Sequence, residues 1–512
     1  QSVPFLRPGK LPRRRTMVAL VAIAASAGLC TILAMFQRSR VLSTSVRRGL
    51  LLRTCTAGRG GVCMAAGDVL RRMIPKGGKV AVIGAGAAGL SAARSLQDFT
   101  DSNLNISVFE QEGRVGGTWS YTDEVGEGVH SSMYKNLRTN IPKEVMPFAG
   151  FPFDKKLPSF MTHQQVLEYL DNFAEHYDIK RHIQFRTKVK KIVKTNPTGE
   201  RGGWGVEWEE IETGDKHKDV FDSVFVCNGH YTVPIMPEIP GLSGFSGKIS
   251  HAHNYRTPDE YKGKTVAVVG AGPSGVDISL EIAKYAKHVY RAQRGVTEVS
   301  THKPGEIQTA PPITRFDGNR AVFGESAVVS EALDSVIFCT GYDYSFPFLD
   351  SSIGVKIEER AVTPLYRHLY FTKDPTLVFV GLPWKVAPFP MFDCQTRHAA
   401  RSLCGMIPIP NQTQMEIARK EDEKMRFEGM GLPRRYYHQF GDLQWDYNKL
   451  LMEEAKIEKE EKSISIDLMR ELYADAGMAR RANPAAYRER NYQVNPDGTW
   501  SWNPSAENIA IG

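Results

Sequence analysis

Two glycine-rich loops, each between an apolar strand and a helical pattern, constrain the fold of this chain most. They lie in "KVAVIGAGAAGLSAARSL" (79–96) and "KTVAVVGAGPSGVDISLEIA" (264–283). In this context G-x-G-x-x-G lets the backbone turn tightly and approach a pyrophosphate at the helix N-terminus. The sequence therefore predicts an α/β protein with two dinucleotide-binding, Rossmann-like domains. The expected binding residues are Gly84, Ala85, Gly86, Ala87, Ala88 and Gly89 in the first loop, and Gly270, Ala271, Gly272, Pro273, Ser274 and Gly275 in the second.

The charge that follows each loop's second strand predicts which dinucleotide the loop binds. "LNISVFE" ends at Glu110, where a carboxylate accepts hydrogen bonds from a ribose diol. "HVYRAQRG" instead ends near Arg294, with Arg291 close by, and no acid stands there. A guanidinium pairs with a 2′-phosphate that a carboxylate would repel. The first loop is therefore expected to hold FAD and the second NADPH, with a hydride passing from one to the other.

The NADPH domain is expected to be a short insertion in a larger FAD domain. "EQEGRVGGTW" (110–119) adds Gly117, Thr118 and Trp119 to the expected flavin site. "VFVCNGHYTVPIMPEIPG" (224–241) and "VIFCTGYDYSFPFLD" (336–350) are each a buried strand and turn suited to return the chain to the flavin domain. The expected divisions are a leader (1–75), a first FAD-domain segment (76–258), the NADPH domain (259–333), a second FAD-domain segment (334–455) and a tail (456–512).

A third stretch, "GFSGKISHAHNY" (244–255), has neither a helical nor a strand period. Its Phe245, Gly247, His251 and Tyr255 fit F-x-G-x-x-x-H-x-x-x-(Y/F) at every fixed position, between the two glycine loops. In this respect the chain resembles the flavin-containing monooxygenases, the class B flavoprotein monooxygenases. The resemblance runs from about 77 to 450 and is strongest to the plant-type, S-oxygenating branch. It implies that this stretch is a linker that couples the two cofactors.

The resemblance also implies a reaction and further site residues. NADPH would reduce FAD, O2 would form a C4a-hydroperoxyflavin, and a soft nucleophile, a sulfide or an amine, would be oxygenated. In "TNIPKE" the resemblance places Asn140 beside the flavin ring as the catalytic residue, and in "QTR" it places Gln395 near the flavin. Thr139 and His251 are the expected further contacts of NADP. Cys339 stands where the family has Ala before Thr-Gly, a change between small residues.

Several other functions stay open or are disfavoured. A Baeyer–Villiger enzyme, which oxygenates ketones, usually ends the motif in Trp followed by Pro or Asp, whereas Tyr255-Arg256 stands here. An indole-keto-acid monooxygenase has a similar motif and stays open. A disulfide reductase is disfavoured because the chain has no C-x-x-C. A non-catalytic flavoprotein subunit of a membrane assembly is the alternative outside catalysis. No metal site is expected, because His163, His176 and His182 lack ligand spacing.

The basic charge of the chain belongs to its leader. Residues 1–75 carry +12 and the remainder −4, so the body offers no electrostatic support for nucleic-acid binding. A chargeless run at 17–36 follows Arg13 to Arg15, and an acid-poor stretch containing Arg and Ser comes next. This pattern predicts delivery to an organelle, a plastid first, or a membrane anchor through 17–36. A homodimer is a further expectation. The tail is predicted to begin with a charged, solvated helix.

Overall fold

The computed structural model describes residues 72–99, 102–195, 203–303, 305–457 and 464–504. The expectations for the leader, including the apolar run 17–36, therefore fall almost entirely outside the described residues. Within the described ranges, no helix combines the length and apolar character that a bilayer crossing requires.

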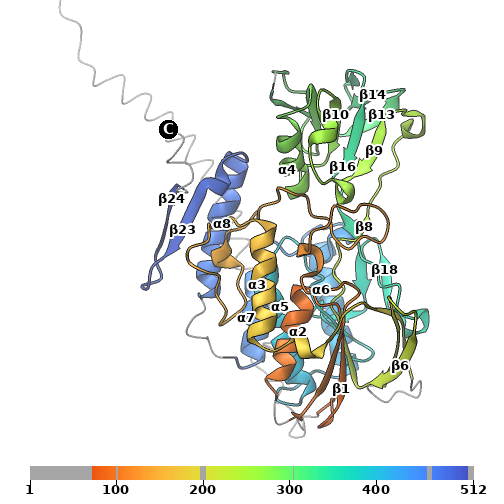
Figure 1. Ribbon diagram of the computed structural model, residues 1–512, viewed down its shortest axis with the longest axis vertical. Coiled ribbons are helices and arrows are strands. Elements are labelled where there is room, and N and C mark those ends of the chain that lie inside the picture. Colours follow the sequence, from red (N-terminus) through yellow and green to blue (C-terminus); the bar gives the residue numbers. More distant parts are fainter. Residues whose placement is uncertain (1–71, 100–101, 196–202, 304, 458–463, 505–512) are drawn as a thin grey trace, which may run out of the picture. The chain divides into compact units, whose positions relative to one another are not determined.

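A mixed sheet, parallel except at one edge, carries the first glycine loop (Figure 1). In spatial order its described strands are β20 (Leu365–Tyr366), β21 (Tyr370–Phe371), β22 (Leu377–Phe379), β7 (Ser223–Val226), β1 (Lys79–Ile83), β2 (Asn105–Phe109) and β3 (Ile183–Gln184). From β22 to β3 all neighbours are parallel, and β20 to β22 pair antiparallel. The carboxyl ends of β7, β1 and β2 therefore meet at one edge, where ligands bind in open α/β sheets.

The apolar run of β1 is continuous because both faces of this sheet are covered. Val80 and Val82 face a core formed with α2 (Ala87–Gln97), α3 (His163–His176) and α5 (Pro388–Leu403). Ala81 and Ile83 face a second core on the opposite side. That core is closed by an antiparallel sheet of β4 (Thr187–Lys194), β5 (Trp204–Glu210) and β6 (Lys216–Phe221).

The leader boundary expected at residue 75 is wrong by a few residues. Ile74 is fully buried in the core beneath α2 and α5. The N–H groups of Met73 and Ile74 donate to the Leu403 carbonyl at 2.9 and 3.0 Å. The Arg72 side chain donates to the Ile74 carbonyl at 2.7 Å. Residues 72–75 are therefore part of the folded body, held by a helix more than 300 positions away in the chain.

A second parallel sheet carries the second glycine loop. Its described strands, in spatial order, are β12 (Ile307–Ala310), β11 (His288–Ala292), β10 (Thr265–Val269), β16 (Ser335–Phe338) and β9 (Lys248–His251). On one face Val266 and Val268 pack with α4 (Pro273–Ile282). On the other face Ala267 packs against β13 (Ile313–Asp317) and β14 (Arg320–Phe323), which pair with β15 (Val328–Val329). Two such sheets, each with a glycine loop, confirm the predicted fold class.

The second sheet is wider than the expected domain 259–333. β9 comes from within the motif 244–255 and forms one edge, while β16 lies between β9 and β10. The strand 336–338, expected to return the chain to the flavin domain, belongs to this sheet. The return comes after it, where β17 (Tyr342–Asp343) pairs antiparallel with β8 (Val233–Pro234). The crossing between the sheets is therefore a pair of short strands, followed by β18 (Lys356–Glu358) and β19 (Ala361–Thr363).

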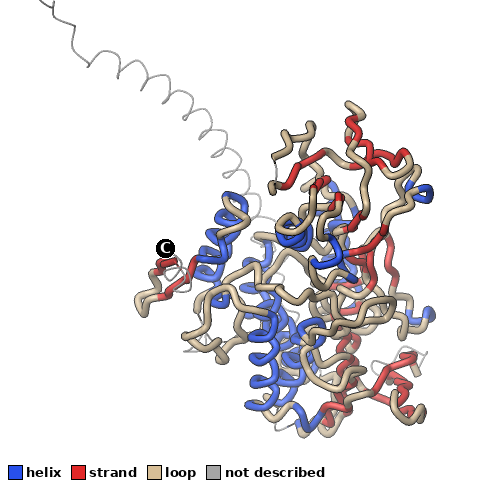
Figure 2. Tube along the Cα trace, turned by 45° about the horizontal axis from the view of Figure 1, so that its top comes forward, coloured by secondary structure: helices blue, strands red, loops and turns tan. Residues whose placement is uncertain are grey.

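Loops rather than regular elements make up much of the described chain, as the tan segments of Figure 2 show. One long loop runs from Glu110 to Thr162, and it contains the short turns η2 (Gly117–Trp119) and η3 (Lys143–Val145) and the isolated bridges Arg138–Thr162 and Phe148–Phe151. Thr162 ends it by capping α3, since its hydroxyl accepts from Gln165 N–H and the Gln165 side chain accepts from Thr162 N–H.

The tail packs on the body, contrary to the expectation of a solvated helix. After α6 (Gln412–Lys424) and α7 (Leu443–Glu454), α8 (Ile466–Ala482) buries Leu468, Met469 and Leu472. These side chains join one core with Phe160 and Trp445. The chain ends its described part in the hairpin β23 (Arg490–Val494) and β24 (Trp500–Pro504), next to α8 in Figure 1. In the sequence, the few apolar residues of α8 stand among many charged ones. The apolar face of this helix was therefore not recognised from the sequence.

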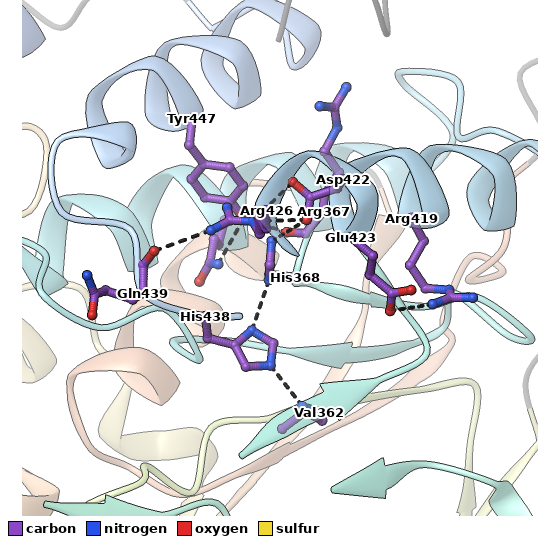
Figure 3. A network of polar contacts seen from close by, with 11 residues as sticks. Val362, Arg367, His368, Arg419, Asp422, Glu423, Arg426, His438, Gln439 and Tyr447 are labelled. Atoms are coloured by element: carbon purple, nitrogen blue, oxygen red, sulfur yellow. Dashed lines mark hydrogen bonds and ion pairs between the residues drawn. The ribbon is translucent and has the colours of Figure 1, made fainter. Parts of the chain in front are cut away.

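A buried polar network joins α6 to β19 (Figure 3). The Val362 N–H donates to His438 Nε2 at 2.9 Å, so this imidazole carries its proton on Nδ1. His438 Nδ1 then donates to His368 Nδ1 at 2.9 Å, and His368 Nε2 donates to Asp422 Oδ2 at 3.0 Å. Arg426 pairs with Asp422 at 3.1 Å. Burial lowers the pKa of both imidazoles, and each imidazole is neutral in this arrangement.

Candidate active site

The first glycine loop joins β1 to α2 in the geometry that a pyrophosphate needs. Gly84 has φ +103°, and a Cβ there would lie 2.8 Å from the Cys227 carbonyl oxygen. A Cβ on Gly89 would lie 1.8 Å from the Gly84 carbonyl oxygen, so only glycine lets α2 start this close to β1. Gly86 is the N-cap of α2 and has no side chain to occupy the first helical N–H groups. These groups are therefore left for an anionic ligand.

Glu110 lies directly after β2 and is tied to the loop. Its Oε2 accepts from Ala85 N–H at 2.7 Å and its Oε1 from Glu112 N–H at 2.9 Å. Burial raises the pKa of this carboxyl group, against the effect of the two N–H donors. Nearby, Gly116 N–H donates to the Ala85 carbonyl at 3.1 Å, which brings η2 over the loop. The structure therefore brings together Glu110, the first loop and the 117–119 turn, as expected.

The second loop repeats this geometry between β10 and α4. Gly270 has φ +118°, and its Cβ would lie 2.5 Å from the Cys339 carbonyl oxygen. A Cβ on Gly275 would lie 2.1 Å from the Gly270 carbonyl oxygen. Gly272 faces open space, with nothing within 4 Å of a Cβ. Pro273 follows as the first residue of α4, a position where its missing N–H costs nothing.

Arg294 lies two residues after β11, on the same sheet edge as the second loop. Its side chain is exposed, and Nη1 donates to the Tyr436 hydroxyl at 2.8 Å. Arg291 is only half-buried and donates from Nη1 to Ser279 Oγ at 3.3 Å. Of the two guanidinium groups, Arg294 is therefore the more accessible to a 2′-phosphate. The Tyr436 contact, from a segment 142 positions away, was not expected from the sequence.

The first half of the motif 244–255 is structural. Phe245 is buried and packs on Phe316, with ring centroids 5.6 Å apart. A Cβ on Gly247 would lie 2.5 Å from the Phe245 ring and 2.6 Å from the Asp334 carbonyl oxygen, which leaves no room for a side chain. These two residues therefore allow β9 to dock beside β16.

The second half of the motif faces the crossing between the sheets. His251 Nδ1 accepts from His253 N–H at 3.1 Å, so its proton is on Nε2. That Nε2 is buried and has no hydrogen-bond partner among the described residues. Burial lowers the pKa of His251 to about 4. The Tyr255 hydroxyl donates to Glu281 of α4 at 2.7 Å. The motif therefore anchors the second loop's helix and leaves one imidazole N–H for a ligand.

Asn140 lies in an irregular segment whose backbone is held on both sides. Thr139 N–H donates to the Met161 carbonyl at 2.8 Å, and Lys143 N–H donates to the Ser159 carbonyl at 2.6 Å. The Thr139 hydroxyl accepts from Met161 N–H at 3.1 Å. Asn140 itself is half-buried, and its amide side chain forms no hydrogen bond within the described residues. Its backbone is thus fixed while its amide stays available; contact of either Thr139 or Asn140 with a cofactor stays a prediction.

Gln395 is fully buried in α5, and protein groups already use both ends of its amide. Its Oε1 accepts from Gly381 N–H at 2.9 Å, and its Nε2 donates to the Tyr447 hydroxyl at 2.9 Å. These bonds brace the turn that follows β22, at the edge of the sheet next to β7. A direct flavin contact of Gln395 stays a prediction.

Sequence reasoning missed three residues around the crossing. His230 and Tyr231 follow β7 at the edge that holds the first loop, and burial lowers the pKa of His230 to about 4. The signal was their place just past a buried parallel strand. Arg256, just after the motif, donates to five backbone carbonyls between 2.6 and 3.1 Å away, from residues 122, 124, 131, 253 and 255. It fastens the 120–131 loop to the motif.

The residues present fit two dinucleotides. Two helices begin at glycines, Gly86 and Gly272, that have no side-chain cap. The first glycine of each loop, Gly84 or Gly270, has a positive φ. The Thr118 hydroxyl and His251 Nε2 are buried polar atoms without partners among the described residues, which a ligand would satisfy.

Four described cysteines, Cys227, Cys339, Cys394 and Cys404, are free thiols.

Comparison with known proteins agrees with this geometry. The family model for flavin-binding monooxygenase-like proteins matches residues 77–303 and 300–458. The flavin-containing monooxygenase FMO GS-OX-like 4 of Arabidopsis thaliana is 37% identical over 434 residues, which cover 80% of this chain and 93% of that protein. A solved structure, S-allyl-L-cysteine S-oxygenase from Allium sativum, is 33% identical with a TM-score of 0.74, over 85% of this chain and 97% of that one.

Two further structures extend the comparison. Tmm from Pelagibacter sp. is 29% identical with a TM-score of 0.72, over 83% of this chain and 96% of that one. Cyclohexanone monooxygenase, at 15% identity and a TM-score of 0.54, shares the fold alone. The family match spans most of the chain, and it coincides with two glycine loops and the motif between them. The chain therefore belongs to the flavin-binding monooxygenase family and is an FAD- and NADPH-dependent monooxygenase that uses O2.

Proposed function

We propose that this monooxygenase oxygenates the sulfur of a small thioether. The observation that carries the proposal is the likeness to the garlic S-oxygenase, at 33% identity over nearly the whole of that protein. The likeness to the plant FMO GS-OX-like proteins supports the same branch. A thioether is a soft, uncharged nucleophile at sulfur, so it needs no protein base to activate it.

The side chains past β7 support an uncharged substrate. His230 is neutral at physiological pH, because burial lowers its pKa to about 4. Its ring lies 5.3 Å from the Tyr344 ring, and the Tyr231 ring lies 5.5 Å from the Tyr342 ring. Tyr231 is 45% exposed, so its ring is accessible to a ligand. The Arg360 guanidinium lies at the border of these rings, where it donates to the Tyr342 carbonyl at 2.7 Å. The aromatic part of this surface suits a thioether.

Asn140 is the proposed catalytic residue. Bound FAD supplies the redox chemistry, taking a hydride from NADPH and activating O2. The chain's role is to hold the reactants and to donate hydrogen bonds in a dry site. The Asn140 amide is suited to this, because Thr139 and Lys143 fix its backbone while no described residue uses its side chain.

A substrate panel tests the proposed reaction. NADPH consumption and product mass are measured with thioethers, tertiary amines, cyclic ketones and an indole keto acid. We expect a product heavier by one oxygen atom from thioethers, with NADPH consumed in proportion. Turnover of ketones or the keto acid with no thioether product would show that the proposed substrate class is wrong.

Asn140→Ser tests the residue. One lost hydrogen bond costs about 0.5–1.5 kcal/mol, and roughly 3 kcal/mol where charge develops. We expect FAD content and NADPH oxidation to persist, while oxygenated product per NADPH falls by about 10- to 100-fold and hydrogen peroxide is released instead. Asn105→Ser is the matched control, since Asn105 is exposed at the start of β2, the end of that strand away from Glu110. Parallel losses of FAD and of both activities in Asn140→Ser would instead assign Asn140 a purely structural role.

A further inference from the structure

The tail contributes a side chain to the centre of the molecule. Arg488 lies in the short turn η11 (Tyr487–Glu489), between α8 and the hairpin β23–β24. Its side chain is only 16% exposed. The match to the family model ends at residue 458, so this residue lies beyond the region of the chain by which the family is defined.

Arg488 contacts both halves of the site. Its Nη1 and Nη2 pair with Asp277 Oδ1 and Oδ2 at 3.0 and 2.5 Å, a bidentate bond to α4. Its Nε donates to the Thr139 carbonyl at 2.9 Å, and Nη2 also donates to the Arg138 carbonyl at 3.3 Å. The Tyr134 hydroxyl donates to Asp277 at 2.9 Å. One guanidinium thus joins the helix of the second loop to the segment that carries Asn140.

The role of the Arg488–Asp277 pair follows from where its contacts lie. Asp277 lies one turn beyond the N-terminus of α4, which begins at the second glycine loop. Thr139 directly precedes Asn140. We propose that Arg488 is a positioning residue, which fixes the Asn140 segment relative to the NADPH-binding helix. The inference rests on the role proposed for Asn140, and it adds that the tail sets the distance between that residue and the nicotinamide nucleotide.

An arginine is needed for this geometry. Its planar fork donates to two carboxylate oxygens at once, and its Nε points away to a third acceptor. A lysine keeps the charge but cannot make all these bonds. The anchor on the tail side is firm, because α8 buries Leu472 and Ala476 in the core with Phe160. The Arg138 guanidinium returns a bond to the Arg488 carbonyl at 3.4 Å and donates to the Phe160 carbonyl at 2.9 Å.

Arg488→Lys is the first test, in the full FAD-loaded chain. Hydrogen–deuterium exchange is followed in peptides covering 136–146 and 273–282, together with hydrogen peroxide release from NADPH without substrate. We expect faster exchange in both peptides and peroxide release raised by about 10- to 100-fold, since small displacements at a reacting centre have effects of this size. Arg490→Lys is the control: Arg490 pairs with Asp475 at 2.8 Å within the tail.

Each outcome decides the proposal. Exchange equal to that of Arg490→Lys, or faster exchange with peroxide release unchanged, overturns it. If Arg488→Lys fails to retain FAD, the double variant Arg488→Gln with Asp277→Asn leaves no buried charge unpaired; wild-type peroxide release there overturns it as well. Asn140→Ser is measured beside these. If it releases no extra peroxide, the role of Asn140 is wrong, whereas the exchange data still test the link made by Arg488.

Discussion

Replacing His438 by Phe tests the buried network of Figure 3. The variant removes the acceptor of the Val362 N–H and the donor to His368 Nδ1, each 2.9 Å away in the wild type. Val362 and His438 are fully buried and His368 nearly so, and water cannot replace the lost partners. Each buried polar group left unsatisfied costs about 1–3 kcal/mol. The expected loss of unfolding free energy, for two such groups, is therefore about 2–6 kcal/mol.

The pH dependence gives a second, independent signature. Burial lowers the pKa of His438 and His368 in the folded protein, with Arg426 lowering it further and Asp422 opposing. The unfolded chain therefore binds more protons below its histidine pKa of about 6.5, and stability falls as the pH drops through this value. Each such imidazole changes the free energy of unfolding by up to about 1.4 kcal/mol per pH unit. His438→Phe should show a shallower slope than wild type.

The assay is urea unfolding of the FAD-loaded enzyme between about pH 8 and pH 5, a range that brackets the unfolded histidine pKa, with FAD in excess. His217→Phe is the control, because His217 is exposed, pairs with Glu210 at 3.2 Å, and stacks its ring on Trp208 at 5.7 Å, a contact that a Phe ring keeps. A surface change of this kind stays within about 0.5 kcal/mol of wild type. A loss below about 1 kcal/mol in His438→Phe, or a pH slope equal to that of wild type, would refute the assigned tautomers and the count of unsatisfied groups.

The remaining predictions concern the nucleotide and the leader. Arg294→Glu should raise the Michaelis constant for NADPH by about 10- to 150-fold and that for NADH little, since a charge-assisted bond to phosphate is lost. Tyr436→Phe should raise it much less; equal losses for both nucleotides would place Arg294 away from the 2′-phosphate. A truncated chain beginning at Arg72 should be soluble and yellow, whereas one beginning at Lys76 should lose about 2–5 kcal/mol, because Ile74 is fully buried. Equal urea midpoints for the two truncations would contradict the new boundary.

The sequence by itself determined the features that depend on neighbours in the chain. The strand–glycine–helix order placed β1, α2, β10 and α4 where the structure has them, because tight turns and helix starts are local. The acid after β2 and the arginine after β11 were found in the same way. The family motif followed from four residues at fixed spacing.

Only the tertiary structure decided what those residues touch. Position 247 has no room for a side chain because the Asp334 carbonyl lies against it. The Tyr255 hydroxyl donates a hydrogen bond to Glu281 of α4. The tertiary structure also decided that the second sheet includes β9 and β16, which pair with each other although 87 positions separate the paired residues. Such pairings depend on chain closure over long distances and leave no periodic trace in either partner.

The tail shows this difference most clearly. In sequence, Arg488 is one arginine in a charged segment, and nothing near it names a partner. In the structure it meets Asp277, 211 positions away, and the Thr139 carbonyl, 349 positions away. Every residue type carries the same backbone carbonyl, so no residue pattern indicates which carbonyl accepts a hydrogen bond. The contact exists only because α8 packs on the body and brings the guanidinium to it.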